Sequence, residues 1–543
     1  MAPIVHVAVA SFTILTLKIL VELISVSIRS PLSNLPGPPS SIFLGHIDQL
    51  FHPQGWDFHM KTVAAFGTAV RLRGFLGEDV LYLTDPLGLR SILTKEHGDI
   101  YDEPPMIIEQ NKLLWGPGLS SSTGAAHKKQ RRVLNAVFSV QRMRMIMPIL
   151  WDVTRRLEES LAKLSRGSCT EIDMLMWMSR VSLESIGQAG VGVPFDTLAE
   201  TSPPSEYMLA SKQLIPLSFP LQGFMRLIPS IVRIGTPRFR GFLAKIAPHP
   251  NIRKLREIIY ILYNTNKSMY QQRVHVIMQA EKIGGAENTG NDMVSVLIQQ
   301  NRGVDAVYKL SDDELISQMG TLIYAGHDMT SVALSRILHV LSLNQERQER
   351  LRLELMDARV QRRDISYDEL MVLPYLDAVC KETLRLYPPV TQLHRVPCKD
   401  SSIPLARPVM GIDGETIDHI CIGAGTTVVV GVAAVNRDPA IWGADADQWI
   451  PERWLGPLPE TVVGAYLPGV YTHTMTFMGG GRSCIGFKFA EMEIKTVLYV
   501  LLSRMKFEPS ETPIVWNMFN FATPTAQGSD GPCMPLKVTL LSE

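Results

Sequence analysis

The sequence lacks the features that mark several protein classes. Its 53 lysines and arginines balance 53 aspartates and glutamates, so the net charge is zero, and neither a polyanion-binding surface nor an acidic tail is indicated. A mean hydropathy of +0.08 is too low for a transporter with many membrane spans. We find no repeat and, apart from one proline-rich run, no low-complexity tract. A nucleic-acid partner and a repeat architecture are therefore disfavoured.

Cysteine is also scarce. The six cysteines among 543 residues are scattered and include no CxxC pair, which disfavours both a structural zinc site and a disulfide framework and favours a reducing compartment. The chain can nevertheless bury a large core, because 46% of its residues are hydrophobic and only 20% are charged. We predict one large domain over residues 41–543.

The longest apolar run lies at the amino terminus. Residues 4–28 would form a helix of about 37 Å, long enough to cross a ~30 Å hydrocarbon layer, although Lys18 and Glu22 interrupt it on one helix face. No Lys or Arg precedes Lys18, whereas a cleaved signal peptide would have one there. We expect residues 1–30 to be a retained membrane anchor; a signal peptide and a buried core helix are the alternatives.

Two proline-containing segments bear on how the chain meets a membrane. Residues 31–40 include the run Leu35-Pro-Gly-Pro-Pro, which cannot be helical and predicts a stiff hinge. Arg29 precedes this hinge, so the positive-inside rule places the body in the cytoplasm. Residues 214–234 are apolar but contain three prolines, so they form either core or a surface that dips into a membrane.

Helical periodicity dominates the body. Strand-like pieces occur at 69–72, 80–83 and 426–432. The last of them lies within a Pro/Gly-rich stretch at 400–470. Helices are predicted at 128–165, 251–282, 311–343, 344–360 and 374–387. The helix at 311–343 opens on a capping box, Ser311 with Glu314, and stays apolar, which predicts a helix through the core.

A glycine-rich loop near the carboxyl terminus holds one cysteine in a setting that suits chemistry. The run from Phe477 to Gly486 reads FMGGGRSCIG and precedes an amphipathic helix at about 487–503. A helix amino terminus favours a thiolate at Cys484, and Arg482 offers a fixed cation to an anionic cofactor group. The alternative is a small buried thiol.

This loop, FxxGxRxCxG, resembles the haem-binding loop of the cytochrome P-450 monooxygenases. A chance match is expected in on the order of one chain in twenty thousand of this composition. The resemblance implies the family fold, mainly α with a smaller β portion. It also implies that Cys484 binds the iron of haem b through its thiolate. Phe477, Gly480, Arg482 and Gly486 would complete the cofactor-binding loop.

Further motifs occur in the family's order. Glu382 and Arg385 resemble its ExxR pair, and with Arg453 they would form a buried structural ion network. Glu349 and Arg352 match the same pattern, but only the first pair has the expected prolines around it.

Three more residues resemble the family's ligands for the haem propionates. Arg395 follows the Pro-Pro turn on a predicted strand, with a surface arginine as the alternative. His127 stands where the family has tryptophan, and an imidazole can also donate to a propionate. Arg131 would be a second donor. The surrounding basic run is a solvated face, and in this family it is also where an acidic reductase docks.

The predicted core helix carries Ala325-Gly-His-Asp-Met-Thr330, which resembles the family's AGxDTT motif. There Asp328 and the next residue normally deliver protons, yet Met329 takes the threonine position, and a thioether donates none. Three possibilities remain open: a helix distortion recruits Thr330, a water or substrate hydroxyl substitutes, or the chemistry needs no relay.

The resemblance implies insertion of one oxygen atom from O2 into a lipophilic molecule, such as a fungal secondary metabolite or terpenoid. Electrons would come from NADPH through a reductase, with cytochrome b5 as a second candidate donor. The expected location is the cytoplasmic face of the endoplasmic reticulum membrane. A haem-thiolate isomerase or dehydratase and a non-catalytic haem-binding protein are the rival hypotheses. Substrate-pocket residues are expected within 101–119, 214–234 and 323–330.

Overall fold

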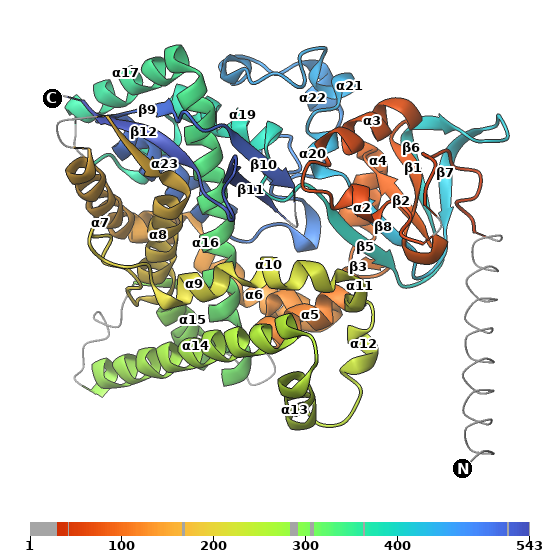
Figure 1. The fold of residues 1–543 in the computed structure, drawn as a ribbon, viewed down its shortest axis with the longest axis horizontal. Helices are drawn as coiled ribbons and strands as arrows, with labels where there is room; N and C mark the ends of the chain where they lie inside the picture. Colours follow the sequence, from red (N-terminus) through yellow and green to blue (C-terminus); the bar gives the residue numbers. More distant parts are fainter. Residues whose placement is uncertain are drawn as a thin grey trace.

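A computed structural model gives the fold (Figure 1) and describes residues 30–41, 43–165, 169–282, 291–303, 309–361, 364–518 and 521–541. The predicted anchor at residues 1–30 lies outside these ranges except for its last residue. Within the ranges described, no helix combines the length and the apolar character needed to cross a membrane.

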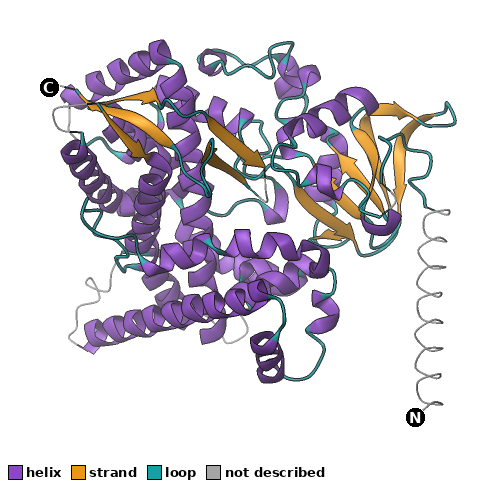
Figure 2. Ribbon diagram, in the orientation of Figure 1, coloured by secondary structure: helices purple, strands orange, loops and turns teal. Residues whose placement is uncertain are grey.

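Helices make up most of the structure, and strands gather mainly in a lobe at one end (Figure 2). The fold is therefore mainly α with a smaller β portion, as the sequence predicts. The helices of ten or more residues are α3 Trp56–Phe66, α5 Pro105–Trp115, α6 Gly124–Asn135, α7 Val140–Leu164, α8 Met174–Ser185, α13 Pro237–Ile246, α14 Pro250–Lys282, α15 Met293–Arg302, α16 Asp312–Leu343, α17 Gln345–Gln361, α19 Pro374–Leu386 and α23 Phe487–Leu502. The shorter helices are α2 Ile47–Leu50, α4 Pro86–Arg90, α9 Glu206–Lys212, α10 Leu214–Ser218, α11 Gln222–Met225, α12 Ile228–Ile231, α18 Tyr367–Met371, α20 Val432–Val435, α21 Pro439–Trp442 and α22 Glu460–Gly464.

The strands form four sheets. The largest has the order β1-β2-β8-β5-β3, in which only β2 and β8 pair in parallel. Its members are β1 Ala69–Arg73, β2 Asp79–Leu83, β3 Tyr101–Asp102, β5 Leu393–Pro397 and β8 Thr427–Val430. The others are β6 Ser401–Met410 with β7 Thr416–Ile422, β10 Ile514–Met518 with β11 Ala522–Ala526, and β4 Thr170–Asp173, β12 Pro535–Leu540 and β9 Met505–Pro509 in that order.

Most predicted elements are confirmed, with two instructive differences. The predicted helix at 128–165 is two helices, because Ser139 adopts an extended conformation and caps α7 through the backbone N–H of Arg142. The hairpin β6–β7 lies in a stretch where prolines and glycines obscured any strand pattern. A two-stranded hairpin tolerates Pro404 because its register is irregular between Pro404 and Val409.

Helix α16 occupies the middle of the helical part (Figure 1). It begins with the predicted capping box, in which Ser311 and Glu314 bond reciprocally, and it packs against α8, α14, α19 and α23. Apolar side chains surround it and belong to one large core, while a second core fills the β-rich lobe. A helix buried on every side requires such an all-round apolar sequence.

The proline-rich hinge packs onto the body instead of standing apart from it. Leu32 and Leu35 are buried in the core of the β-rich lobe. The carbonyl of Pro36 accepts a hydrogen bond from the backbone N–H of Arg71 in β1 at 2.9 Å. Asn34 donates to Asp413 at the tip of the β6–β7 hairpin. The run thus covers a sheet edge where its missing amide donors cost nothing.

The core alternative holds only for the start of the apolar segment 214–234, where Leu214 belongs to the core and Leu217 packs against it. The segment forms α10, α11 and α12 with a single 3₁₀ turn between the first two, and among its residues with described burial only Leu214 is buried. The prolines divide the segment into helices too short to bury an apolar face. Its large apolar side chains are exposed instead: Phe224, Leu227, Ile231 and Ile234.

Acid should destabilise the fold through buried imidazoles. His59 is buried beside the Tyr82 hydroxyl, and burial lowers its pKa to about 4. Below pH 6.5 the unfolded chain binds a proton that the folded chain does not, so stability is lost as the pH falls from about 6.5 toward 4. Between pH 7 and 5.5 this one residue should lower the free energy of unfolding by about 1 kcal/mol.

Urea unfolding at these two pH values tests the assignment. The free energy of unfolding should fall less in His59→Gln than in the parent. It should fall as much as in the parent in the control His419→Gln, because the His419 imidazole is exposed. Equal losses in all three proteins would contradict this assignment.

Candidate active site

The loop before α23 presents Cys484 to the interior. The backbone N–H of Cys484 donates to the carbonyl of Phe477 at 2.9 Å, which closes the loop. Gly480 has φ of +71°, and a Cβ there would lie 1.7 Å from the carbonyl oxygen of Leu93. The loop therefore needs glycine at this position. Gly486 meets no such constraint, since a Cβ there would only touch the Phe138 ring at 3.5 Å.

Cys484 lies in the wall of a cavity of about 330 Å³, called here the central cavity. One wall is α16, and the opposite wall is the cysteine loop with the start of α23. The α16 residues are Leu322, Ala325, Gly326, Met329, Thr330 and Ala333, and the facing residues include Phe477, Met478, Ile485, Phe489 and Ile494. The lining is mostly apolar, so a ligand held here is shielded from water.

The environment of Cys484 contains opposing influences on its thiol. Burial raises the pKa of Cys484, while the backbone N–H of Gly486 and the cation of Arg131 act to lower it. Arg131 is close because it donates to the carbonyl and hydroxyl oxygens of Ser483, at 2.5 and 2.9 Å. Burial has the largest effect on the thiol alone; a coordinated metal ion would deprotonate it outright.

A buried cluster of cationic and imidazole side chains lies beside the loop. It contains Arg395 from β5, Arg482 from the cysteine loop, and His127 and Arg131 from α6, so the fold brings the three predicted propionate ligands together with Arg482. Arg482 donates to Asp102 at 2.8 Å, and Asp102 is thus its counter-charge. Arg395 is 1% exposed and its Nε has no hydrogen-bond partner among the described residues.

His97 joins this cluster and was missed by sequence reasoning. Its ring lies so close to Gly481 that a Cβ there would stand 2.3 Å from it, and its ring centroid is 6.2 Å from that of His127. Its Nδ1 is buried without a partner in the described part of the chain. Burial lowers the pKa of both imidazoles, to about 3 for His127. The sequence offers no motif around His97 that could have identified it.

Helix α16 presents different residues to two cavities. Successive residues of a helix are 100° apart around its axis, so Met329 and Thr330 are neighbours on its surface. Both line the central cavity without any break in the helix. Thr330 therefore needs no helix distortion to reach it. Asp328 and Thr330 are two positions apart, which is about 160° around the helix axis. Asp328 accordingly lies on the other side of α16.

Asp328 lines a second cavity of about 480 Å³ between α8, α9, α16 and the β10–β11 hairpin. Lys212 of α9 and Asp173, which caps α8, share this cavity. Burial lowers the pKa of Lys212, and the carboxylates of Asp328 and Asp173 oppose that shift. Lys212 is a second functional candidate that sequence reasoning missed, because nothing in the local pattern separates it from an exposed helix-end lysine.

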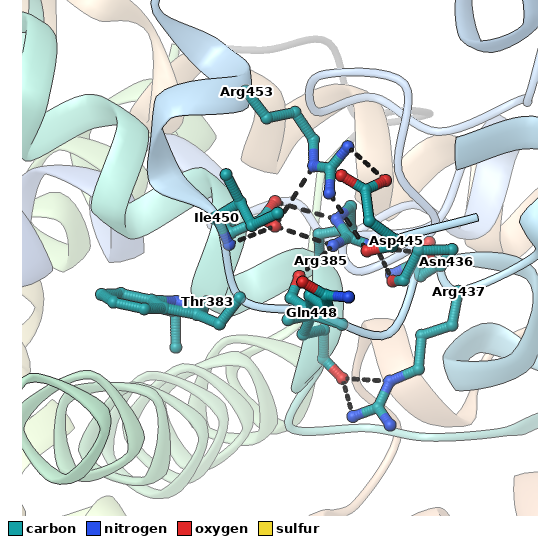
Figure 3. Close-up of polar contacts among 12 residues, drawn as sticks. Thr383, Arg385, Asn436, Arg437, Asp445, Gln448, Ile450 and Arg453 are labelled. Carbon is teal, nitrogen blue, oxygen red and sulfur yellow. Dashed lines mark hydrogen bonds and ion pairs between the residues drawn. The ribbon is translucent and has the colours of Figure 1, made fainter. Parts of the chain in front are cut away.

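The predicted ion network is confirmed (Figure 3). Glu382 and Arg385 are both completely buried and bonded through two contacts of 2.7 and 2.9 Å. Arg453 reaches Glu382 at 3.3 Å, and the indole N–H of Trp454 donates to its other oxygen. Arg385 also donates to three backbone carbonyls, those of Asn436, Ala446 and Gln448. The network ties α19 to the segment that leads into the cysteine loop.

The matching pair Glu349 and Arg352 is an exposed ion pair on α17, so its sequence pattern has no comparable role.

Only some of the segments expected to form the substrate pocket line a cavity. Of residues 323–330, the central cavity is lined by Ala325, Gly326, Met329 and Thr330, whereas segment 214–234 contributes Ile215, Pro216 and Phe219 to the second cavity. Residues 101–119 line neither of these two cavities.

Comparison with known proteins gives a consistent result. The family model described as Cytochrome P450 matches residues 35–528. The chain is 41% identical to cytochrome P450 monooxygenase 91 of Postia placenta, over 95% of both chains. It is 39% identical to the ganoderic acid synthetase of Ganoderma lucidum, again over 95% of both chains. A cytochrome P450 monooxygenase of Hericium erinaceus is 34% identical over 94% of each chain.

Proposed function

Since this chain belongs to the cytochrome P450 family of monooxygenases, we propose that it inserts one oxygen atom from O2 into a lipophilic small molecule at a membrane. The observation that carries the proposal is the placement of Cys484 in the wall of the apolar central cavity, opposite the Thr330 side of α16. NADPH supplies the two electrons through a reductase, with cytochrome b5 as an alternative donor.

The family implies a haem iron with a cysteine thiolate ligand, and the residues present fit that group. Cys484 is the only cysteine in the lining of the central cavity. At the neighbouring cluster, the buried and unpartnered Arg395 Nε and His97 Nδ1 are the donors that two propionates require. Arg482 and Arg131 add cations to this side, and the neutral His127 adds an N–H donor. The haem, when bound, supplies the activation of dioxygen.

The chain's own residues hold the reactants and manage protons. The apolar lining of the central cavity excludes water, and Gly326 keeps α16 close to Ile186, whose side chain would crowd any Cβ at that position. Thr330 offers its hydroxyl at the cavity wall. Asp328 lines the second cavity together with Lys212. Because the side chains of Asp328 and Thr330 diverge around α16, a water or a substrate hydroxyl would have to link them in a proton relay.

The substrate class follows from the lining and from one relative. An apolar cavity binds a lipophilic molecule, and the Ganoderma lucidum relative is named for the synthesis of ganoderic acid. A fungal secondary metabolite or terpenoid is therefore the proposed substrate.

An exposed apolar surface supports membrane attachment. It consists of Phe224, Leu227, Ile231 and Ile234 around α11 and α12, Phe239, Phe242, Leu243 and Ile246 of α13, and Phe43, Leu44, Phe75 and Leu76. Arg226 joins the first and last groups by pairing with Glu78. A surface of this extent is expected to be covered. Together with the apolar residues 4–28, it favours the cytoplasmic face of the endoplasmic reticulum membrane.

The outward face of α6 supports docking of an acidic reductase. Lys128 and Arg132 are exposed one turn apart, while His127 and Gln130 of the same helix are buried. The helix therefore offers a basic, solvated face to a partner and its opposite face to the cofactor side, which supports the proposed docking.

Oxygen labelling tests the proposed reaction. Microsomes containing the protein and a fungal reductase are given NADPH, a lipophilic extract of the source cells and heavy-isotope O2. A new product with one heavy oxygen, absent without NADPH, supports the proposal. A new product without label would support an isomerase or dehydratase, and no NADPH-dependent product would favour a non-catalytic haem protein.

The hydroxyl of Thr330 should determine how efficiently electrons yield product. Thr330→Val keeps the shape and removes only the hydroxyl, so product formed per NADPH consumed should fall about tenfold or more. Met329→Thr adds a second hydroxyl to the same wall and should raise the ratio, while Met329→Leu serves as the control of similar volume. An unchanged ratio in Thr330→Val would show that protons take another path.

A further inference from the structure

Arg336 of α16 is a buried cation without a counter-charge. Its side chain is almost entirely buried, with 8% of the residue exposed. Within the described residues it makes no ion pair and no hydrogen bond, and its Nε is unsatisfied. The guanidinium carbon instead lies 3.5 Å from the centroid of the Trp516 ring and 4.3 Å from that of Tyr387. The buried Arg180, by contrast, is paired with Asp196.

On α16, Arg336 lies one turn beyond Ala333, a residue that lines the central cavity. Arg336 is seven residues after Met329, hence only about 20° from it around the helix axis. Helical side chains lean toward the amino terminus, here toward Ala333. Tyr387 likewise lies two residues before Pro389, another lining residue.

In the described part of the chain, no neighbouring group cancels the charge. Arg437 lies 5.1 Å from the same Tyr387 ring and adds a second cation; its guanidinium donates to the carbonyl of Leu386. His339 is neutral at pH 7, because burial lowers its pKa to about 4, and it accepts the Trp516 indole N–H. Burial also lowers the pKa of Arg336, yet a guanidinium stays protonated in proteins. Aromatic faces stabilise a cation without neutralising it.

We propose that Arg336 is a fixed positive charge that raises the reduction potential of the haem iron. The step concerned is a one-electron reduction of Fe(III) to Fe(II), in which no bond is made or broken. The electron comes from the reductase in turnover or from dithionite in the experiment. An added electron makes the site more negative, and in a low-dielectric interior a nearby unpaired cation stabilises that form. Arg336 thus acts on the iron through its field and not by contact. The inference rests on the proposed haem site.

The test compares midpoint potentials of purified, substrate-free holoproteins by spectroelectrochemistry. Arg336→Gln should lower the Fe(II) to Fe(III) ratio at fixed potential about tenfold, a shift of about 59 mV for one electron. Arg336→Lys keeps the charge and should remain near the parent. The matched control is Arg350→Gln, because Arg350 also stacks on a tyrosine, Tyr375 at 4.2 Å, but is half exposed and paired with Glu452. It should leave the potential unchanged.

The proposal would be overturned if Arg336→Gln had the same midpoint potential as the parent. Equal shifts of the midpoint potential in Arg336→Gln and Arg336→Lys would also overturn it, in favour of a packing role. If Arg336→Gln fails to fold, Tyr387→Glu decides, since it retains Arg336 and supplies a counter-charge; its potential should fall, and an unchanged value would overturn the proposal. The carbon monoxide difference spectrum of the parent separates a failure of the proposed haem site from a failure of the role proposed for Arg336. A parent without a haem-thiolate spectrum contradicts the haem site itself, whereas a normal spectrum with unchanged potentials contradicts only the role of Arg336.

Discussion

Replacing Cys484 with alanine should abolish product formation, with a loss of at least about a thousandfold. The thiolate is the residue expected to bind the iron and to supply the electron density that favours O–O cleavage. The variant should fold, because the loop is closed by the backbone bond between Cys484 and Phe477, which does not involve the side chain. Haem content, the carbon monoxide difference spectrum and product yield measure the effect.

The matched control is Cys380→Ala. Cys380 is buried, and burial raises the pKa of its thiol, but it lies on α19 and does not line the central cavity. Its loss should lower stability modestly through a small cavity and leave the spectrum and the reaction intact. Retention of product formation in Cys484→Ala, or loss of the spectrum in Cys380→Ala alone, would contradict the assignment.

Replacing Glu382 with alanine should lower the free energy of unfolding by about 3–5 kcal/mol. The change leaves Arg385 completely buried with no carboxylate, removes one acceptor of Arg453, which keeps Asp445, and removes the acceptor of the Trp454 indole N–H. Since the network joins α19 to the segment before the cysteine loop, haem content should fall together with stability. Chemical unfolding of the protein and its pyridine haemochrome content give the two readouts.

Glu349→Ala is the control for this prediction, because it breaks a pair of the same spacing on the surface of α17. Its effect on stability should stay within about 1 kcal/mol. Equal effects of the two substitutions would show that burial does not distinguish the two pairs and would remove the structural role assigned to Glu382.

The sequence predicts the helical framework well, because long elements carry many periodic positions. The span of α16 and its capping box at Ser311 follow from local pattern alone. Motif spacing likewise identifies Cys484, Arg395 and the Glu382 network. The β6–β7 hairpin and the break at Ser139 are not predicted from the sequence, because prolines and a single capping serine leave little periodic signal.

What the sequence cannot supply is the direction in which side chains point and the contacts between distant segments. The motif places Asp328 next to Met329 and Thr330, but the helix turns its carboxylate into a different cavity. His97 and Arg336 are ordinary residues in sequence. One becomes noteworthy through its contact with Gly481, and the other through burial without a partner. Such features depend on tertiary packing that no local pattern encodes.

The most direct measurement is X-ray absorption at the iron K-edge of the purified protein and of Cys484→Ser. The iron should have one sulfur atom among its neighbours in the parent and none in the variant. A parent iron bound only by nitrogen and oxygen, or a sulfur that persists in Cys484→Ser, would contradict the placement of the haem iron at Cys484.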